Sequence, residues 1–317
     1  MDTFKLLNLD SLCRNGQQPQ DLEFSMQLLE EAIKLGCVNV LECSGEVPYN
    51  TCTLAAAHNQ LEVLKWGLGK GKRKDREICN QAALNGHLEI LKWAIANGCP
   101  LHVEACSLAA QGGHLEIVKF LASKKKWDEQ TCTLAILHDH LDIFNWCVEN
   151  GCPFDESTFA AAASKGNLDL LEFLESKDCD WDYSACDSAA YSGQLETLKW
   201  LKWKGCLSWG TKTCSEAARG GQLEVLKWLR GNSCPWNEET CFEAARGGHL
   251  EILKWARSKG CKWNFSVCTT AASHGHLEVL KWLVSNGCPC EAYSCFNLSR
   301  SHEQVRDWVA SYFGIQR

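Results

Sequence analysis

Cysteine is the residue type that most clearly invites a chemical role, because this 317-residue chain contains 21 of them. Most of them occupy one of two positions that recur along the chain, which we call two registers. A cysteine of one register is often followed seven residues later by a cysteine of the other, as Cys234 is by Cys241. Zinc requires four ligands at about 2.3 Å from one point, whereas equivalent positions on stacked helices lie roughly 8–10 Å apart. We therefore predict no metal site and no cofactor, and expect these thiols to be small buried hydrophobic groups. The first register is Cys52, Cys79, Cys106, Cys132, Cys186, Cys214, Cys241, Cys268 and Cys295, and the second is Cys99, Cys152, Cys179, Cys206, Cys234, Cys261 and Cys288.

Histidine and tryptophan also recur, and structural explanations are favoured for both. Histidines such as His249 share their position with glutamine and asparagine, so the common property is hydrogen bonding, and we predict that this position holds a turn. Tryptophans such as Trp255 are predicted to lie in the core. A second set, such as Trp236, precedes a helix; stacking on single-stranded nucleic acid or sugars is one interpretation, and packing between repeats is the favoured one.

Other candidate motifs for chemistry are weak. Two basic runs, at 70–76 and 124–126, are either solvated loops or sites for nuclear import or an acidic partner. No Ser–His–Asp, Cys–His or paired-carboxylate arrangement stands apart in the sequence from its repeating pattern. We therefore predict no catalytic residues and no enzyme.

The elements that carry these residues repeat along the chain. A leucine recurs at spacings of 26 to 28 residues, and the phrase His-Leu-Glu-Ile-Leu-Lys-Trp at 249–255 returns as His-Leu-Glu-Val-Leu-Lys-Trp at 276–282. A fixed period of this size is typical of a solenoid, in which each unit buries its apolar face against its neighbours. The recurring leucines are Leu61, Leu88, Leu115, Leu141, Leu168, Leu195, Leu223, Leu250 and Leu277.

Each repeat is predicted to form two short helices joined by a tight turn. In the unit at 234–260, acidic residues and Thr240 open a first helix that ends near Arg246, and a second helix runs from His249 to about Ser258. Alternation with period two is absent from the sequence, so no strand is assigned. The turn between the helices always carries a residue that tolerates a left-handed backbone, namely Asn59, Gly86, Gly113, Asp139, Gly166, Gly193, Gly221, Gly248 or Gly275.

The stretch at 240–254, with its Ala-Ala and Gly-His-Leu-Glu, resembles the ankyrin repeat, whose usual phrase is T-P-L-H-x-A-A-x-x-G-H-x-E-V-V. The period here is shorter than the 33 residues of that family, and Thr-Cys-Phe-Glu replaces T-P-L-H, so the histidine of that phrase does not carry over. The resemblance implies an all-α solenoid of stacked helix-turn-helix repeats, with the β-hairpin finger shortened or absent. The array looks like the short, Trp- and Cys-rich variants that are expanded in large DNA viruses and some protists.

The two ends are expected to act as caps, because a terminal repeat must face water. Residues 28–37 echo 90–99, which indicates a degenerate first unit, and Val305 and Trp308 sit like their counterparts in the preceding repeat. We predict an N-terminal cap at 1–50, nine ankyrin-like repeats at 51–290 and a C-terminal capping repeat at 291–317.

A partner surface is predicted where the repeats differ from one another. The end of the first helix varies while its neighbours do not, and matching positions in the ankyrin family line the concave face that contacts partners. Tyr191, Arg219 and Arg246 are the strongest candidates, because Tyr and Arg are enriched among interface hot spots and these three occupy consecutive repeats. Another variable position of the first helix holds Glu216 and Glu243. The predicted partner-binding residues are Leu84, Gln111, Leu137, His138, Lys165, Tyr191, Arg219, Arg246 and His274.

Charge and composition narrow the partner and the compartment. A net charge of -7 argues against non-specific binding of nucleic acid. The sequence opens without a signal peptide and has no apolar run of 18 residues. We therefore expect reduced thiols in the cytoplasm or nucleus, no secretion, no membrane, and a monomer that binds a protein partner as a scaffold or adaptor. A nucleic-acid-binding solenoid and a thiol or metal sensor are the alternatives.

Overall fold

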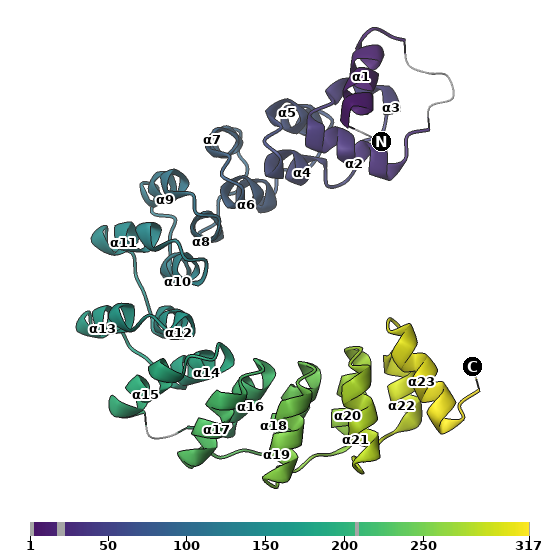
Figure 1. Ribbon diagram of the computed structural model, residues 1–317. Helices are drawn as coiled ribbons and strands as arrows, with labels where there is room; N and C mark the ends of the chain where they lie inside the picture. The colour runs from purple at the N-terminus through teal and green to yellow at the C-terminus, as the bar shows by residue number, and fades with distance from the viewer. Residues whose placement is uncertain (1–2, 18–22, 207–208, 317) are drawn as a thin grey trace. The chain divides into compact units, whose positions relative to one another are not determined.

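The computed structural model describes residues 3–17, 23–206 and 209–316 (Figure 1). Within these ranges the chain forms 23 α-helices and no strand, which confirms the predicted all-α fold, in which the β-hairpin finger was expected to be shortened or absent. The chain divides by its internal contacts into two units, Met1–Phe154 and Asp155–Arg317. None of the described helices is long and apolar enough to cross a membrane.

The first unit begins with three helices and continues as stacked helix pairs. Helix α1 (Thr3–Arg14) packs on α3 (Val38–Ser44), and α2 (Met26–Leu35) packs on α3. First helices α4, α6, α8 and α10 pack side by side, and each also packs on its own second helix. The pairs are α4 (Thr51–Ala57) with α5 (Leu61–Gly69), α6 (Arg76–Leu84) with α7 (Leu88–Ala96), α8 (Glu104–Gln111) with α9 (Leu115–Ala122), and α10 (Glu129–Leu137) with α11 (Leu141–Glu149).

The second unit repeats this arrangement six times. Figure 1 shows α16, α18 and α20 standing side by side, each with its second helix next to it. The pairs are α12 (Glu156–Lys165) with α13 (Leu168–Ser176), α14 (Tyr183–Tyr191) with α15 (Leu195–Trp203), α16 (Thr211–Arg219) with α17 (Leu223–Gly231), α18 (Glu238–Arg246) with α19 (Leu250–Ser258), α20 (Phe265–Ser273) with α21 (Leu277–Ser285), and α22 (Ala292–Leu298) with α23 (Glu303–Phe313).

Local sequence explains where these short helices begin and how they pack. The Asn237 side chain accepts a hydrogen bond from the backbone N–H of Glu239 and so caps α18, and Asp155 caps α12 in the same way. Ala244 and Ala245 of α18 are fully buried, and their small side chains let neighbouring first helices approach closely. Helices of seven to ten residues are too short to be stable alone, so packing between neighbours supplies their stability.

The predicted left-handed turn is present in all nine repeats. Each of the nine residues has a positive φ, including Asn59 at 60° and Asp139 at 64°, the two places where glycine is absent. A positive φ is costly for most residues and is best tolerated by Gly, Asn and Asp. The sequence therefore identified the turn correctly from residue type alone.

The N-terminal repeat is present, but in a different register from the one that its sequence suggests. Residues 28–37 echo a second helix, yet α2 packs beside the first helix α4, and α3 packs beside the second helix α5. Gly36, with φ 79°, lies under the side chain of Gln60, as Gly86 lies under the ring of His114 in a regular repeat. Helix α2 is thus a first helix, followed by the usual turn.

The cysteines are buried as predicted, and the tryptophans are buried only in part. All but Cys43 and Cys290 are buried, and none of the 21 forms a disulfide. The second-helix tryptophans, such as Trp255, are half-buried and not fully buried core residues. Four of them pack on the loop tryptophan of the same repeat, as Trp255 does on Trp236 with ring centroids 5.7 Å apart. The Arg257 guanidinium covers Trp263 at 3.9 Å from the ring centroid and so joins one repeat to the next.

A candidate partner interface on the first helices

The predicted partner-binding residues all lie where a first helix ends. In the first unit, Leu84, Gln111 and Leu137 are the last residues of α6, α8 and α10, and His138 follows α10 directly. In the second unit, Lys165, Tyr191, Arg219 and Arg246 end α12, α14, α16 and α18, and His274 follows α20. Leu84, Gln111 and Lys165 are half-buried, whereas the other six are exposed.

Three of these residues form one continuous group with two glutamates. We call this group the arginine row: Tyr191, Glu216, Arg219, Glu243 and Arg246. The Arg219 guanidinium carbon lies 5.4 Å from the centre of the Tyr191 ring. Its Nε is 3.7 Å from Glu243 Oε2, and its Nη1 is 3.4 Å from Glu216 Oε2. Arg246 Nη1 lies 3.5 Å from the other oxygen of Glu243. The row therefore crosses α14, α16 and α18 without a break.

Burial differs along the arginine row in a way that suits binding. The Glu243 side chain is only 12% exposed, whereas those of Arg219 and Arg246 are 43% and 45% exposed. Both guanidinium groups stay nearly half exposed while they are paired with Glu243, so a partner can reach them without leaving the Glu243 carboxylate unpaired. In the sequence, the two glutamates of the row were noted only because their position varies between repeats. The arginine that follows each of them by three residues could have predicted the ion pair, since residues three apart are neighbours on a helix.

The backbone beneath the row is held firmly by the next repeat. His249 Nε2 donates to the carbonyl oxygen of Arg219 at 3.1 Å, and His276 Nε2 donates to that of Arg246 at 2.9 Å. Gln194 makes the same kind of bond, to the carbonyl oxygen of Ser164. These contacts confirm that the recurring His or Gln holds the turn.

His274 lies beside the row. It stacks on His276, with ring centroids 6.3 Å apart, and its Nδ1 lies 3.0 Å from the Thr270 carbonyl oxygen. His274 thus contacts the ring that holds the Arg246 backbone. The four residues of the first unit occupy the same place in their own repeats.

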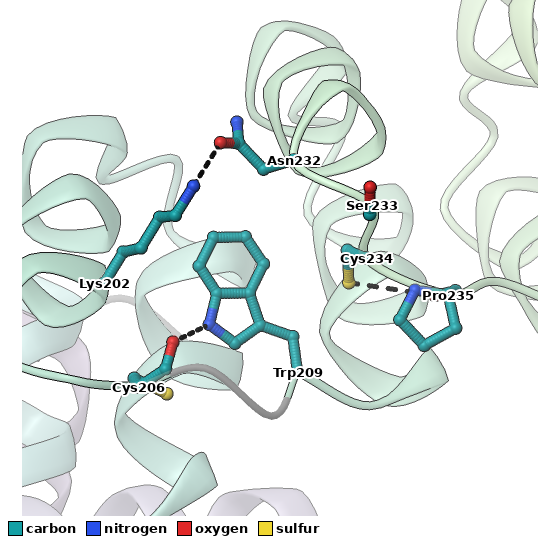
Figure 2. A pocket seen from close by; sticks show the side chains of 7 residues that line it. All are labelled: Lys202, Cys206, Trp209, Asn232, Ser233, Cys234 and Pro235. Atoms are coloured by element: carbon teal, nitrogen blue, oxygen red, sulfur yellow. Dashed lines mark hydrogen bonds between the residues drawn. The ribbon is translucent and has the colours of Figure 1, made fainter.

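A cavity of about 190 Å³ lies elsewhere in the second unit (Figure 2). Lys202, Trp209, Asn232 and Cys234 are among the residues that line it. Lys202 Nζ donates to Asn232 Oδ1 at 2.5 Å, and Trp209 Nε1 donates to the Cys206 carbonyl oxygen at 2.6 Å. Sites for small molecules usually measure about 300–1,000 Å³, so this cavity is small for one.

Comparison with known proteins supports the repeat assignment. A family model described as ankyrin repeats (3 copies) matches residues 52–133, 79–154 and 214–294. A search of curated proteins gives no match. Two crystal structures of the pentatricopeptide repeat protein PPR10 with an 18-nt psaJ RNA element, one of them a cysteine-to-serine variant, are similar at 14% identity and a TM-score of 0.40. Each alignment covers 93% of this chain and 53% of that one, so this chain spans about half of their length.

The family model covers more than half of the sequence, and its matches fall on helix pairs in both units. The chain therefore belongs to the ankyrin repeat family.

Proposed function

We propose that this protein is a non-enzymatic scaffold or adaptor that binds a protein partner through the first-helix ends, the face that is concave in ankyrin repeats. The observation that carries the proposal is the arginine row, which places Tyr191, Arg219 and Arg246 side by side on consecutive repeats. Tyr and Arg are the residue types that dominate interface hot spots. A rigid backbone beneath them reduces the entropy lost on binding.

The chemistry of the row favours a partner that presents carboxylates and an aromatic or aliphatic side chain. Arg219 and Arg246 each offer several N–H donors in a planar fork, which suits a carboxylate better than a lysine would. Tyr191 is 46% exposed and provides apolar area beside these donors. We also propose that the protein acts as a monomer. The absence of disulfides among its 21 cysteines supports a reducing compartment.

Nucleic-acid binding receives less support from the same contacts. The loop tryptophans that suggested base stacking are already engaged, as Trp236 is with Trp255 and with the Arg230 guanidinium. A ring covered in this way offers little face to a base.

The test is capture of partners from a native-like extract with three forms of the full chain. The first is the unchanged protein, and the second carries Tyr191→Ala, Arg219→Ala and Arg246→Ala. The matched control changes lysines of the second helices in the same region, each of which pairs with a glutamate three residues earlier. The control substitutions are Lys199→Ala, Lys227→Ala and Lys254→Ala.

We expect mass spectrometry to identify a protein that the unchanged chain and the lysine control recover equally and that the row variant loses by about 30-fold, as the loss of a hot spot of about 2 kcal/mol implies. Circular dichroism should show the same helix content for all three forms. Equal recovery by the row variant would refute the site. Recovery that disappears after nuclease treatment would favour the nucleic-acid alternative.

A further inference from the structure

Three buried thiols meet at one point inside the repeat formed by α10 and α11. Cys132 lies on α10, Cys147 on α11, and Cys152 in the loop that follows α11. Their three sulfur atoms all lie within 4.8 Å of one another. Cys132 and Cys147 are fully buried, and Cys152 is 3% exposed.

The cluster arises because one extra cysteine joins an ordinary pair. Cys132 and Cys152 belong to the two cysteine registers, and the corresponding pair Cys186 and Cys206 has its sulfur atoms 2.8 Å apart. Cys147 belongs to neither register. The equivalent positions of the other second helices hold Gly67, Ala94, Leu121, Leu174, Leu201, Leu229, Ala256 and Leu283.

The reason for predicting no metal site from the sequence does not apply to this cluster. That argument compared thiols in successive repeats, which are separated by a helix-to-helix distance. The two registers and Cys147 instead converge within a single repeat, where α10 packs on α11 and the following loop returns to them.

The geometry matches what a thiophilic ion requires. Metal–sulfur bonds of about 2.3 Å place the sulfur atoms of one site roughly 3.8–4.0 Å apart, which the cluster can reach through small side-chain rotations. Thiolates select Cu(I) and Zn²⁺ among biological metal ions. Three sulfur ligands complete a trigonal Cu(I) site, whereas Zn²⁺ adds a fourth ligand such as water.

We propose that Cys132, Cys147 and Cys152 bind one thiophilic d¹⁰ cation, Cu(I) or Zn²⁺, as thiolates. Each sulfur that binds loses its proton to solvent and forms one metal–sulfur bond, and the metal keeps its oxidation state.

A backbone contact also positions one of the three thiols. Cys152 donates to the carbonyl oxygen of Asp128 at 3.4 Å, which holds its sulfur at the edge of the group.

The test is titration of the metal-free, reduced full chain without oxygen, once with Cu(I) and once with Zn²⁺, each in competition with a coloured chelator. Cys147→Ala removes the extra thiol and installs the alanine that occurs at positions 94 and 256. Cys186→Ala is the matched control, because it also removes one fully buried thiol but from a two-thiol pair. Cys152→Ser provides a second variant if Cys147→Ala does not fold, and circular dichroism checks the helix content of each form.

We expect the unchanged chain to take one more equivalent of metal from the chelator than Cys147→Ala does, and Cys186→Ala to match the unchanged chain. The metal should raise the melting temperature of the same two forms and leave that of Cys147→Ala unchanged. Cu(I) and Zn²⁺ are distinguished by which of them gives this extra equivalent. Equal stoichiometry in the unchanged chain and Cys147→Ala, or no metal retained against either chelator, would overturn the proposal.

Discussion

The imidazole Nε2 of His276 lies 2.9 Å from the carbonyl oxygen of Arg246, 30 residues earlier in the chain. A carbonyl oxygen only accepts hydrogen bonds, so Nε2 carries the hydrogen and donates. The bond joins the start of one second helix to the end of the preceding repeat's first helix. It therefore ties the repeat stack to the residue that displays the Arg246 side chain.

Substitutions of His276 should show whether its hydrogen bond to the Arg246 carbonyl oxygen is what stabilises the protein. His276→Ala leaves the Arg246 carbonyl oxygen without this partner and should lower the free energy of unfolding by about 1–2 kcal/mol. His276→Gln should retain most of the stability, because Gln194 makes the equivalent bond at 3.2 Å. Urea unfolding of the three forms measures the difference. If the glutamine variant were as unstable as the alanine variant, hydrogen bonding would not be the role of this position.

Two glycines close in sequence should respond in opposite ways to alanine. A Cβ on Gly220 would overlap the backbone carbonyl oxygen of Tyr191, while a Cβ on Gly231 meets nothing within 4 Å. We expect Gly220→Ala to cost about 1–3 kcal/mol and to lower partner binding, because Tyr191 must move. Gly231→Ala, at the end of α17, should stabilise the protein by about 0.5–1 kcal/mol. Thermal melts that rank the two variants in the reverse order would contradict the structure.

Stability should fall steeply in alkaline solution. Burial raises the pKa of Cys79 and of Cys106 to about 12 from an ordinary value of 9.0. Between these values the unfolded chain loses thiol protons that the folded chain keeps, so the free energy of unfolding decreases as pH rises. Each such thiol contributes a slope of about 1.4 kcal/mol per pH unit once its unfolded form is ionised. The stabilisation is fully present below pH 9.

Cys79→Ala provides the check on that slope. Urea unfolding in the presence of a reductant, from neutral pH to pH 10, should show a smaller loss of stability for this variant than for the unchanged chain. The difference in slope approaches the contribution of one thiol at the upper end of the range. Parallel curves for the two proteins would show that Cys79 ionises equally in both states.

Local sequence determined the repeat itself. A residue that accepts a left-handed backbone marks every turn, so even Asn59 and Asp139 were assigned correctly, because backbone preference acts within one residue. The helix bounds followed from polar caps and from apolar spacing, which act within a few residues. The burial of the thiols followed from the general tendency of free cysteine to be buried.

Tertiary structure alone decided which residues meet. Glu243 lies between Arg219 and Arg246 because first helices pack side by side. The sequence shows which positions vary, but it does not show the distances between residues on different helices. Cys147 lies next to Cys132 because α11 packs on α10. Cys147 belongs to neither cysteine register, so the repeat pattern did not predict this contact. Helix α2 resembles a second helix and yet packs as a first one, since the same apolar spacing serves both places. The spacing of apolar residues determines which side of a helix is buried. Only the packing of the folded chain determines which other helix that side contacts.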